Sequence, residues 1–207
     1  MIKLNKRDVI FGSVALAGLA LGAPQSFAVD LKGLNDPPAF GEMTMGPDTA
    51  KVTVIEYASA SCPHCAAFYN DTFPALKKEY IDSGKIRFVF REFPHNDAAL
   101  AAFMIARSAP KEAYFSLIDI FFKTQSTWLA GNWGDGLFNI AKQAGFTKET
   151  FDATLKDKVV MQKILDVRDK AEKFGVTGIP TFFINGEMLD GEQKIESLRA
   201  KIDPLLM

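Results

Sequence analysis

The spacing of hydrophobic and polar positions changes along the chain, and each change predicts an element. Residues 51–57 form an apolar, β-branched run that is typical of a buried strand, and residues 86–93, Ile-Arg-Phe-Val-Phe-Arg-Glu-Phe, are predicted to form the second strand. Between them, residues 62–83 have the spacing of a helix. Two strands joined through a helix predict a β-α-β unit, in which the strands run parallel.

The connecting helix has recognisable start, kink and stop signals. Ser61 is a suitable N-cap, and Pro63 suits the first turn, where a missing N–H is tolerated. Pro74 predicts a kink, and Gly84 predicts the end of the helix.

The second half of the chain is mainly helical and ends in a hairpin and a last helix. No clear strand pattern occurs in residues 96–174. The Asn185-Gly186 pair between short runs predicts a hairpin turn. The predicted helices cover residues 98–108, 111–124, 136–144, 148–155, 158–174 and 192–202, and the hairpin strands cover residues 181–184 and 187–189.

The first residues have the pattern of a leader. A basic start precedes an uncharged, mostly apolar run at residues 9–23, and Ser26 and Ala28 are the small residues that a cleavage site requires. The run is shorter than the roughly 20 residues that span a bilayer, so a membrane anchor is the less favoured alternative. We therefore predict a signal peptide at residues 1–28, cleaved after Ala28, and an extended arm rich in Pro and Gly at residues 29–50.

Composition narrows the class of protein. The 207 residues are 48% hydrophobic and 24% charged, with a net charge of −1, as in ordinary soluble globular proteins. This charge balance does not favour binding to nucleic acid. The two cysteines, Cys62 and Cys65, stand three positions apart. We therefore expect one local redox or metal site rather than a disulfide-stapled scaffold.

The tetrapeptide Cys62-Pro63-His64-Cys65 follows the first strand and opens the helix. Unpaired N–H groups and the helix dipole stabilise negative charge at that position, and His64 can add a positive charge or a hydrogen bond. The pKa of Cys62 should therefore fall below that of a free thiol, which makes Cys62 the nucleophile toward disulfides. Cys65, one turn later, can resolve the mixed disulfide. Replacing His64 is expected to raise the pKa of Cys62.

Other uses of the cysteine pair fit the sequence less well. Zinc would need two more ligands, and the only histidines are His64 and His95, so we predict no metal. Covalent haem needs a histidine directly after Cys65, where Ala66 stands, and we predict no cofactor. A structural disulfide that closes so short a loop would restrict the unfolded chain little. His95, beside Pro94, is interpreted as a surface residue.

With this order of elements, the chain resembles the thioredoxin superfamily, and more narrowly the bacterial periplasmic disulfide oxidoreductases of the DsbA family. The resemblance rests on Cys62-Pro63-His64-Cys65 between a strand and a helix, and on Val-Thr-Gly-Ile-Pro-Thr at residues 176–181 before a strand. It covers essentially all of the chain after the leader. It implies an α/β, thioredoxin-like fold formed by residues 51–95 and 175–207, with an inserted helical domain at residues 96–174.

The resemblance implies roles for three further residues. Pro180 is expected to be a cis-proline beside the dithiol, and the backbone at Ile179 is expected to pair with the substrate chain as a β-strand does. Glu56 is expected to be a buried acid that assists proton transfer to or from Cys65, and a surface carboxylate at the strand edge is the alternative. An isoleucine before this proline is more typical of reducing thioredoxins than of oxidases.

The function that the resemblance implies is a periplasmic thiol:disulfide oxidase, which donates the Cys62–Cys65 disulfide to unfolded exported proteins with cysteine thiols. A membrane quinone-linked partner would re-oxidise it, and a monomer is expected. A reductase or isomerase of the same fold is the first alternative, and a stable oligomer would favour an isomerase. A non-enzymatic holdase with an apolar peptide groove is the second, and Trp128 and Trp133 are candidates for the rim of that groove.

Overall fold

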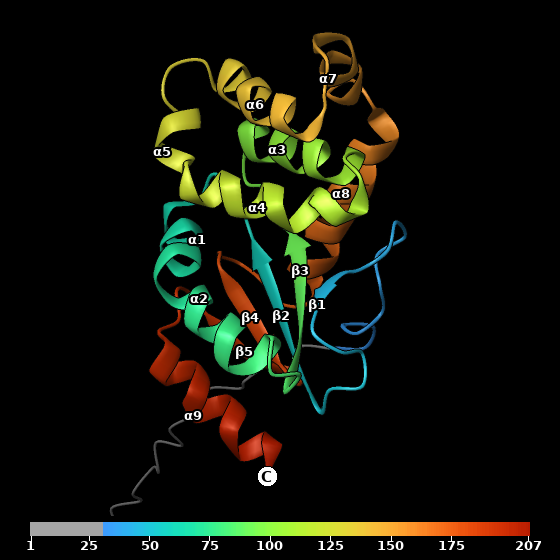
Figure 1. Ribbon diagram of the computed structural model, residues 1–207. Coiled ribbons are helices and arrows are strands. Elements are labelled where there is room, and N and C mark those ends of the chain that lie inside the picture. Colours follow the sequence, from blue (N-terminus) through green and yellow to red (C-terminus); the bar gives the residue numbers. More distant parts are fainter. Residues whose placement is uncertain (1–30) are drawn as a thin grey trace, which may run out of the picture.

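A single sheet with helices on both faces forms the centre of the computed structural model, which describes residues 31–207 (Figure 1). The predicted signal peptide lies outside the described residues. Within them, the strand order is β1-β3-β2-β4-β5. As predicted, β2 and β3 are parallel, whereas the other neighbouring pairs are antiparallel. The strands are β1 (Met43–Met45), β2 (Val52–Ala58), β3 (Ile86–Glu92), β4 (Thr181–Ile184) and β5 (Glu187–Asp190).

Side chains of the central strands enter two cores, because successive residues of a strand point to opposite faces. On β2, Val54 belongs to the larger core, and Ile55 and Tyr57 belong to the smaller one. The larger core includes the helix that follows β2, most of the helical block and the C-terminal helix α9 (Ile195–Leu206). The smaller core is closed by α8 (Lys158–Lys173) and by Leu34 of the N-terminal arm.

The helix after β2 is divided into short segments. α1 (Pro63–Ala67) and α2 (Phe73–Leu76) are separated by a π-helical turn at Phe68–Thr72, and a second π turn covers Lys77–Ile81. The predicted single helix with a kink is therefore a continuous run of α and π turns. Pro74 lies in the first turn of α2, where its missing N–H is tolerated.

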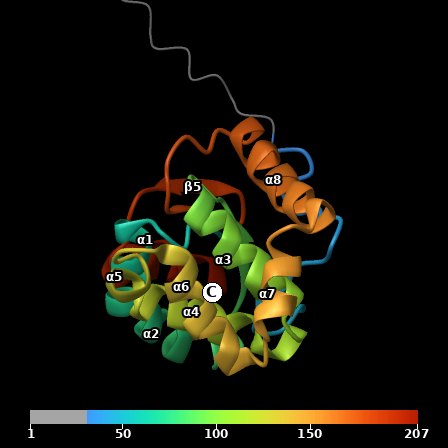
Figure 2. The ribbon, with the colours of Figure 1, turned by 90° about the horizontal axis from the view of Figure 1, so that it is seen from above.

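A block of helices connects β3 to β4. α3 to α7 lie above the carboxyl ends of β2 and β3 in Figure 1, and α8 lies to one side of them when seen from above (Figure 2). The predicted helices are confirmed, with ends shifted by a few residues. The short α5 was not predicted. The elements are α3 (Asp97–Ser108), a 3-10 turn (Lys111–Ala113), α4 (Tyr114–Lys123), α5 (Gln125–Trp128), α6 (Trp133–Ala141), a 3-10 turn (Lys142–Ala144), α7 (Lys148–Thr154) and α8.

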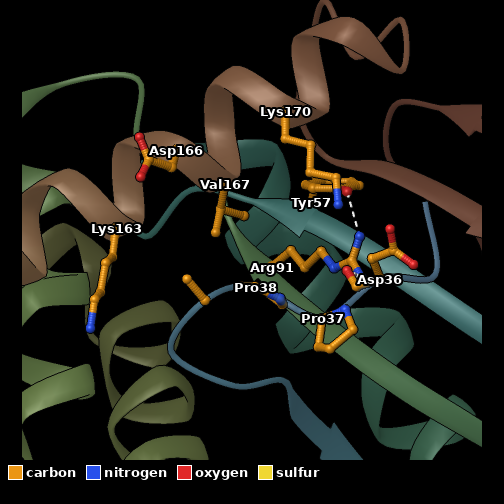
Figure 3. A pocket seen from close by; sticks show the side chains of 10 residues that line it. Asp36, Pro37, Pro38, Tyr57, Arg91, Lys163, Asp166, Val167 and Lys170 are labelled. Carbon is orange, nitrogen blue, oxygen red and sulfur yellow. Dashed lines mark hydrogen bonds between the residues drawn. The ribbon is translucent and has the colours of Figure 1, made fainter. Parts of the chain in front are cut away.

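The N-terminal arm is fixed to the body by the buried guanidinium of Arg91. It donates to the carbonyl oxygens of Leu34 at 2.7 Å and Asp36 at 3.3 Å, to the Tyr57 hydroxyl at 2.8 Å, and to the Glu42 carboxylate at 2.9 Å. Arg91 also lines a small pocket of about 140 Å³ between the arm and α8, and Figure 3 shows the hydrogen bond from its guanidinium to the Tyr57 hydroxyl.

The arm also contributes an element that the sequence did not predict. β1 pairs antiparallel with β3, from Met43 opposite Phe90 to Met45 opposite Phe88. The expectation of an arm that is only extended is therefore wrong for these three residues. Their strand is formed by pairing with the sheet edge, and it does not belong to a long apolar run, because Glu42 and Gly46 flank it directly.

Candidate active site

Cys62 lies where the chain turns from β2 into α1. Its backbone is extended, with φ −84° and ψ 123°, and it is the N-cap residue, with Pro63 in the first turn. The predicted cap, Ser61, does not cap the helix, because its hydroxyl donates to Asn96 Oδ1 at 2.9 Å. The sulfur of Cys62 therefore lies next to the unpaired N–H groups of the first helical turn.

The surroundings of Cys62 favour its thiolate, as predicted. The pKa is lowered to about 6, chiefly by a hydrogen bond from the Cys65 thiol, against the opposing effect of burial. The backbone N–H groups of Cys65 and His64 and the charge of His95 lower it further. In its thiol form, Cys62 Sγ donates to the Ile179 carbonyl oxygen at 3.6 Å.

Cys65 has the opposite environment. It has no exposed surface, and its sulfur accepts a hydrogen bond from the Ser59 N–H at 3.5 Å. Burial, the hydrogen bond to Cys62 and the nearby charges of Cys62 and Glu56 raise its pKa. Both cysteines are free thiols in this structure. The pair thus combines a sulfur that ionises near neutral pH with one that stays protonated.

The two histidines have different positions around the pair. The His64 side chain is 73% exposed and lies 3.4 Å from the Glu192 carboxylate, so its contribution to the Cys62 pKa comes from its backbone N–H. His95 is also exposed, as predicted, but its Nδ1 lies 2.7 Å from the Ser59 hydroxyl, beside the site. A signal for this was present in the sequence, because His95 follows β3, and parallel strands end at the same edge of a sheet.

Pro180 and Ile179 lie beside the dithiol at the start of β4. The peptide bond between them is cis, as the resemblance implied, and Pro180 is buried. The Ile179 carbonyl oxygen accepts the hydrogen bond from the Cys62 thiol. The expected pairing of this backbone with a substrate chain stays a prediction.

Glu56 is buried at the centre of the sheet. It has no exposed surface, and its neighbours in register are Phe90 on β3 and Phe182 on β4. The alternative of a surface carboxylate at a strand edge is therefore wrong. Neither carboxyl oxygen has a hydrogen-bond partner within the described chain, and burial raises the pKa well above its ordinary value. Burial thus favours the neutral, protonated form of the Glu56 carboxyl.

One contact to the pair comes from a residue that sequence reasoning missed. The buried amide of Gln125 on α5 donates to the carbonyl oxygens of Ala60 at 2.8 Å and Cys62 at 3.0 Å. No local pattern marked Gln125, because the contact joins segments more than sixty residues apart.

Comparisons with known proteins agree with this geometry. A family model described as thioredoxin matches residues 39–204. The crystal structure of alpha-DsbA1 from Wolbachia pipientis has a TM-score of 0.75 at 30% identity, and the match covers 82% of this chain and 93% of that chain. The chain belongs to the thioredoxin superfamily and is DsbA-like. The thioredoxin-like fold with a helical insertion is thereby confirmed.

Two curated relatives of this DsbA-like chain have related names. A Rickettsia bellii protein named as a protein-disulfide oxidoreductase is 35% identical, over 78% of this chain and 63% of that protein. A Bacillus anthracis protein named as disulfide bond formation protein D is 28% identical, over 78% of this chain and 77% of that protein. The chain spans about three fifths of the length of the rickettsial relatives.

Of the two candidates for the rim of a peptide groove, Trp128 is excluded by its burial, whereas a rim role for Trp133 stays a prediction. Trp128 is buried, and its indole N–H donates to the Phe121 carbonyl at 2.8 Å. Trp133 is half-buried and packs against the larger core. Both side chains serve the packing of the DsbA-like helical block.

Proposed function

We propose that this protein is a thiol:disulfide oxidase that introduces disulfide bonds into exported proteins through Cys62 and Cys65. The observation that carries the proposal is the asymmetry of the pair, since the pKa of Cys62 is lowered to about 6 while that of Cys65 is raised. A stable Cys62 thiolate stabilises the reduced protein. The disulfide form is then a strong oxidant, because its reduction produces this stabilised thiolate.

In the proposed reaction, a substrate thiolate attacks Cys62 Sγ, and the Cys62–Cys65 bond breaks. Cys65 leaves as a thiolate and takes a proton, for which we assign the buried Glu56 acid as the donor. A second substrate thiolate then attacks the sulfur of the first, and Cys62 leaves as a thiolate. The substrate dithiol is oxidised to a disulfide, and its electron pair remains on the reduced enzyme.

Substrate binding is assigned to the surface around Cys62. Pro63 and His64 are exposed beside it, so a polypeptide can approach the sulfur. We assign the backbone of Ile179, next to Pro180, as the segment that pairs with an extended substrate. The distance of 3.6 Å between the Ile179 oxygen and Cys62 Sγ supports this assignment.

The proposal includes the cellular setting. Residues 1–28 would be a cleaved signal peptide, and the protein would act in the periplasm as a monomer, re-oxidised by a membrane quinone-linked partner. The thioredoxin-like part would be residues 51–95 and 175–207, with the inserted domain at residues 96–174. DsbA-like membership supports this setting. Within residues 31–207, no helix combines the length and apolar character needed to cross a membrane.

The deciding experiment is the reduction potential of the chain without residues 1–28, measured by equilibration with reduced and oxidised glutathione. A potential above that of the glutathione pool supports the oxidase. A potential well below it would replace the oxidase by a reductase or isomerase. In a parallel folding assay, Cys62→Ser should lose all activity, and full activity of this variant would indicate a holdase.

A further inference from the structure

Tyr69 is a buried tyrosine that the proposed reaction has not used. Its side chain is 3% exposed, and its hydroxyl has no hydrogen-bond partner within the described chain. The ring stacks on Phe73 with centroids 4.4 Å apart, and its centroid lies 4.3 Å from that of Phe122. A phenylalanine would keep these ring contacts without burying a polar group. The hydroxyl therefore needs a reason other than packing.

The hydroxyl shares its environment with Glu56. Phe90 lies directly opposite Glu56 on the neighbouring strand, and the Tyr69 ring contacts Phe90 edge-on with centroids 6.3 Å apart. Residues opposite each other on paired strands point to the same face, so Glu56 points to the face that Tyr69 covers. In residues 31–207, the buried side-chain atoms without a partner are the two Glu56 oxygens and the Tyr69 oxygen.

Tyr69 also borders a surface cleft, although its hydroxyl is buried. Together with Phe73, it lines an open cleft of about 350 Å³, whose other walls include Asp119 and Lys123. These two side chains form an ion pair of 2.9 Å. Burial raises the pKa of Tyr69, and the charges of Glu56, Asp119 and Cys65 raise it further. Tyr69 therefore lies within electrostatic range of both the cleft and the buried acid.

We propose that the Tyr69 hydroxyl relays protons between this cleft and the Glu56 carboxyl, and so controls how fast Cys65 gains or loses its proton. The inference rests on the proposed function. When the disulfide opens, Glu56 gives its proton to the Cys65 thiolate, and Tyr69 passes a proton from the cleft to the Glu56 carboxylate through a bridging water, since the two side chains are not hydrogen-bonded to each other. When the disulfide closes, the Cys65 proton leaves by the same groups in reverse. No electrons move in either transfer.

The test uses the step in which Cys65 closes the disulfide. Oxidised glutathione is mixed with the reduced protein to form a mixed disulfide at Cys62, and the release of glutathione by Cys65 is followed by rapid quench between pH 5 and 9. With Tyr69→Phe, we expect this step to slow roughly tenfold or more at neutral pH, because a positioned acid–base group contributes on the order of 10²–10⁴-fold and Glu56 remains. We also expect its solvent deuterium isotope effect and pH profile to change.

Tyr80→Phe is the matched control. Tyr80 belongs to the same run of helical turns and is equally buried, but its hydroxyl donates to Asp203 at 2.6 Å. Tyr80→Phe should therefore lower the stability and leave the closing rate unchanged. Tyr69→Phe should slow closure while the stability does not fall, because the removed hydroxyl has no partner, and the Cys62 titration stays at its wild-type value.

The outcomes separate this inference from the proposed function. A Tyr69→Phe protein with the wild-type rate, pH profile and isotope effect would overturn the relay and leave the oxidase proposal intact. A wild-type protein whose mixed disulfide never closes would overturn the proposed function itself. Equal slowing in the Tyr69 and Tyr80 variants would assign the effect to packing and would also reject the relay.

Discussion

The reactivity of Cys62 depends on single groups from separate parts of the chain. Cys65 and His64 act from α1, Ile179 acts from the segment before β4, and His95 acts from the loop after β3. The sequence indicates the first two through the tetrapeptide. It indicates His95 only indirectly, because His95 follows β3, whose carboxyl end lies beside that of β2.

The two histidines should therefore differ when they are replaced. We expect His95→Asn to raise the pKa of Cys62 above about 6, since it removes a charge that stabilises the thiolate. His64→Ala should raise it less, because alanine keeps the backbone N–H that reaches the sulfur. The measurement is the thiolate absorbance of the reduced protein against pH, with Cys62→Ser as the blank. A larger shift in His64→Ala would show that the His64 ring, not His95, is the effective charge.

At the scale of elements, the N-terminal arm depends on one buried ion pair. The side chains of Arg91 and Glu42 are 3% and 9% exposed, and the pair fixes the arm beside β3. Glu42→Ala should cost about 3–5 kcal/mol, because it leaves the guanidinium buried and unpaired. Asp48→Ala is the control, since its partner Arg87 forms an exposed pair that is worth about 0–1 kcal/mol. Urea unfolding measures both, and equal losses would mean that Arg91 does not hold the arm.

Two glycines on either side of β1 give a second matched pair. Gly46 and Gly41 both have a left-handed backbone, with φ 83° and 89°. A Cβ at Gly46 would lie 2.2 Å from the Ile86 carbonyl oxygen, whereas one at Gly41 would meet nothing within 4 Å. We expect Gly41→Ala to cost about 1–2 kcal/mol from backbone strain and Gly46→Ala about 1–3 kcal/mol more from the clash. Thermal unfolding distinguishes the two, and similar melting temperatures would show that the strands separate to relieve the contact.

The elements that the sequence predicted are those with a local signal. β2 and β3 are apolar β-branched runs, and the Asn185-Gly186 turn joins β4 to β5, with positive φ at both residues. β1 and α5 lack such a signal, because each is short and is formed by contacts with distant residues. The same distinction applies to the residues of the site. The cysteines were predictable from their spacing, whereas no local pattern marks Gln125 or Tyr69.

At the scale of the whole molecule, the helical block and the sheet meet at the dithiol. The Gln125 amide of α5 donates two hydrogen bonds from the helical block, one to the Ala60 carbonyl oxygen and one to the Cys62 carbonyl oxygen. The loop that carries the Cys62 thiolate is thus positioned by both the sheet and the helical block. The stabilisation of this thiolate should consequently appear in the unfolding free energy of the entire chain.

We therefore expect the stability difference between the dithiol and disulfide forms to depend on pH. The pKa of Cys62 is about 6 in the folded dithiol, below the roughly 8.5 of an unfolded cysteine, so the unfolded dithiol binds more protons between these values. The dithiol form should gain stability relative to the disulfide form as pH rises from about 6 to 8.5, by at most about 1.4 kcal/mol per unit. Below about pH 7.5 Cys65 adds little slope, because it is protonated in both the folded and the unfolded dithiol. At about pH 8.5 it opposes the gain, because its pKa is raised in the folded protein and the unfolded thiol begins to ionise first. Urea unfolding of both forms at pH 5, 7 and 8 measures the difference. A constant difference would show that the folded protein does not stabilise the thiolate, and the oxidase proposal would lose its physical basis.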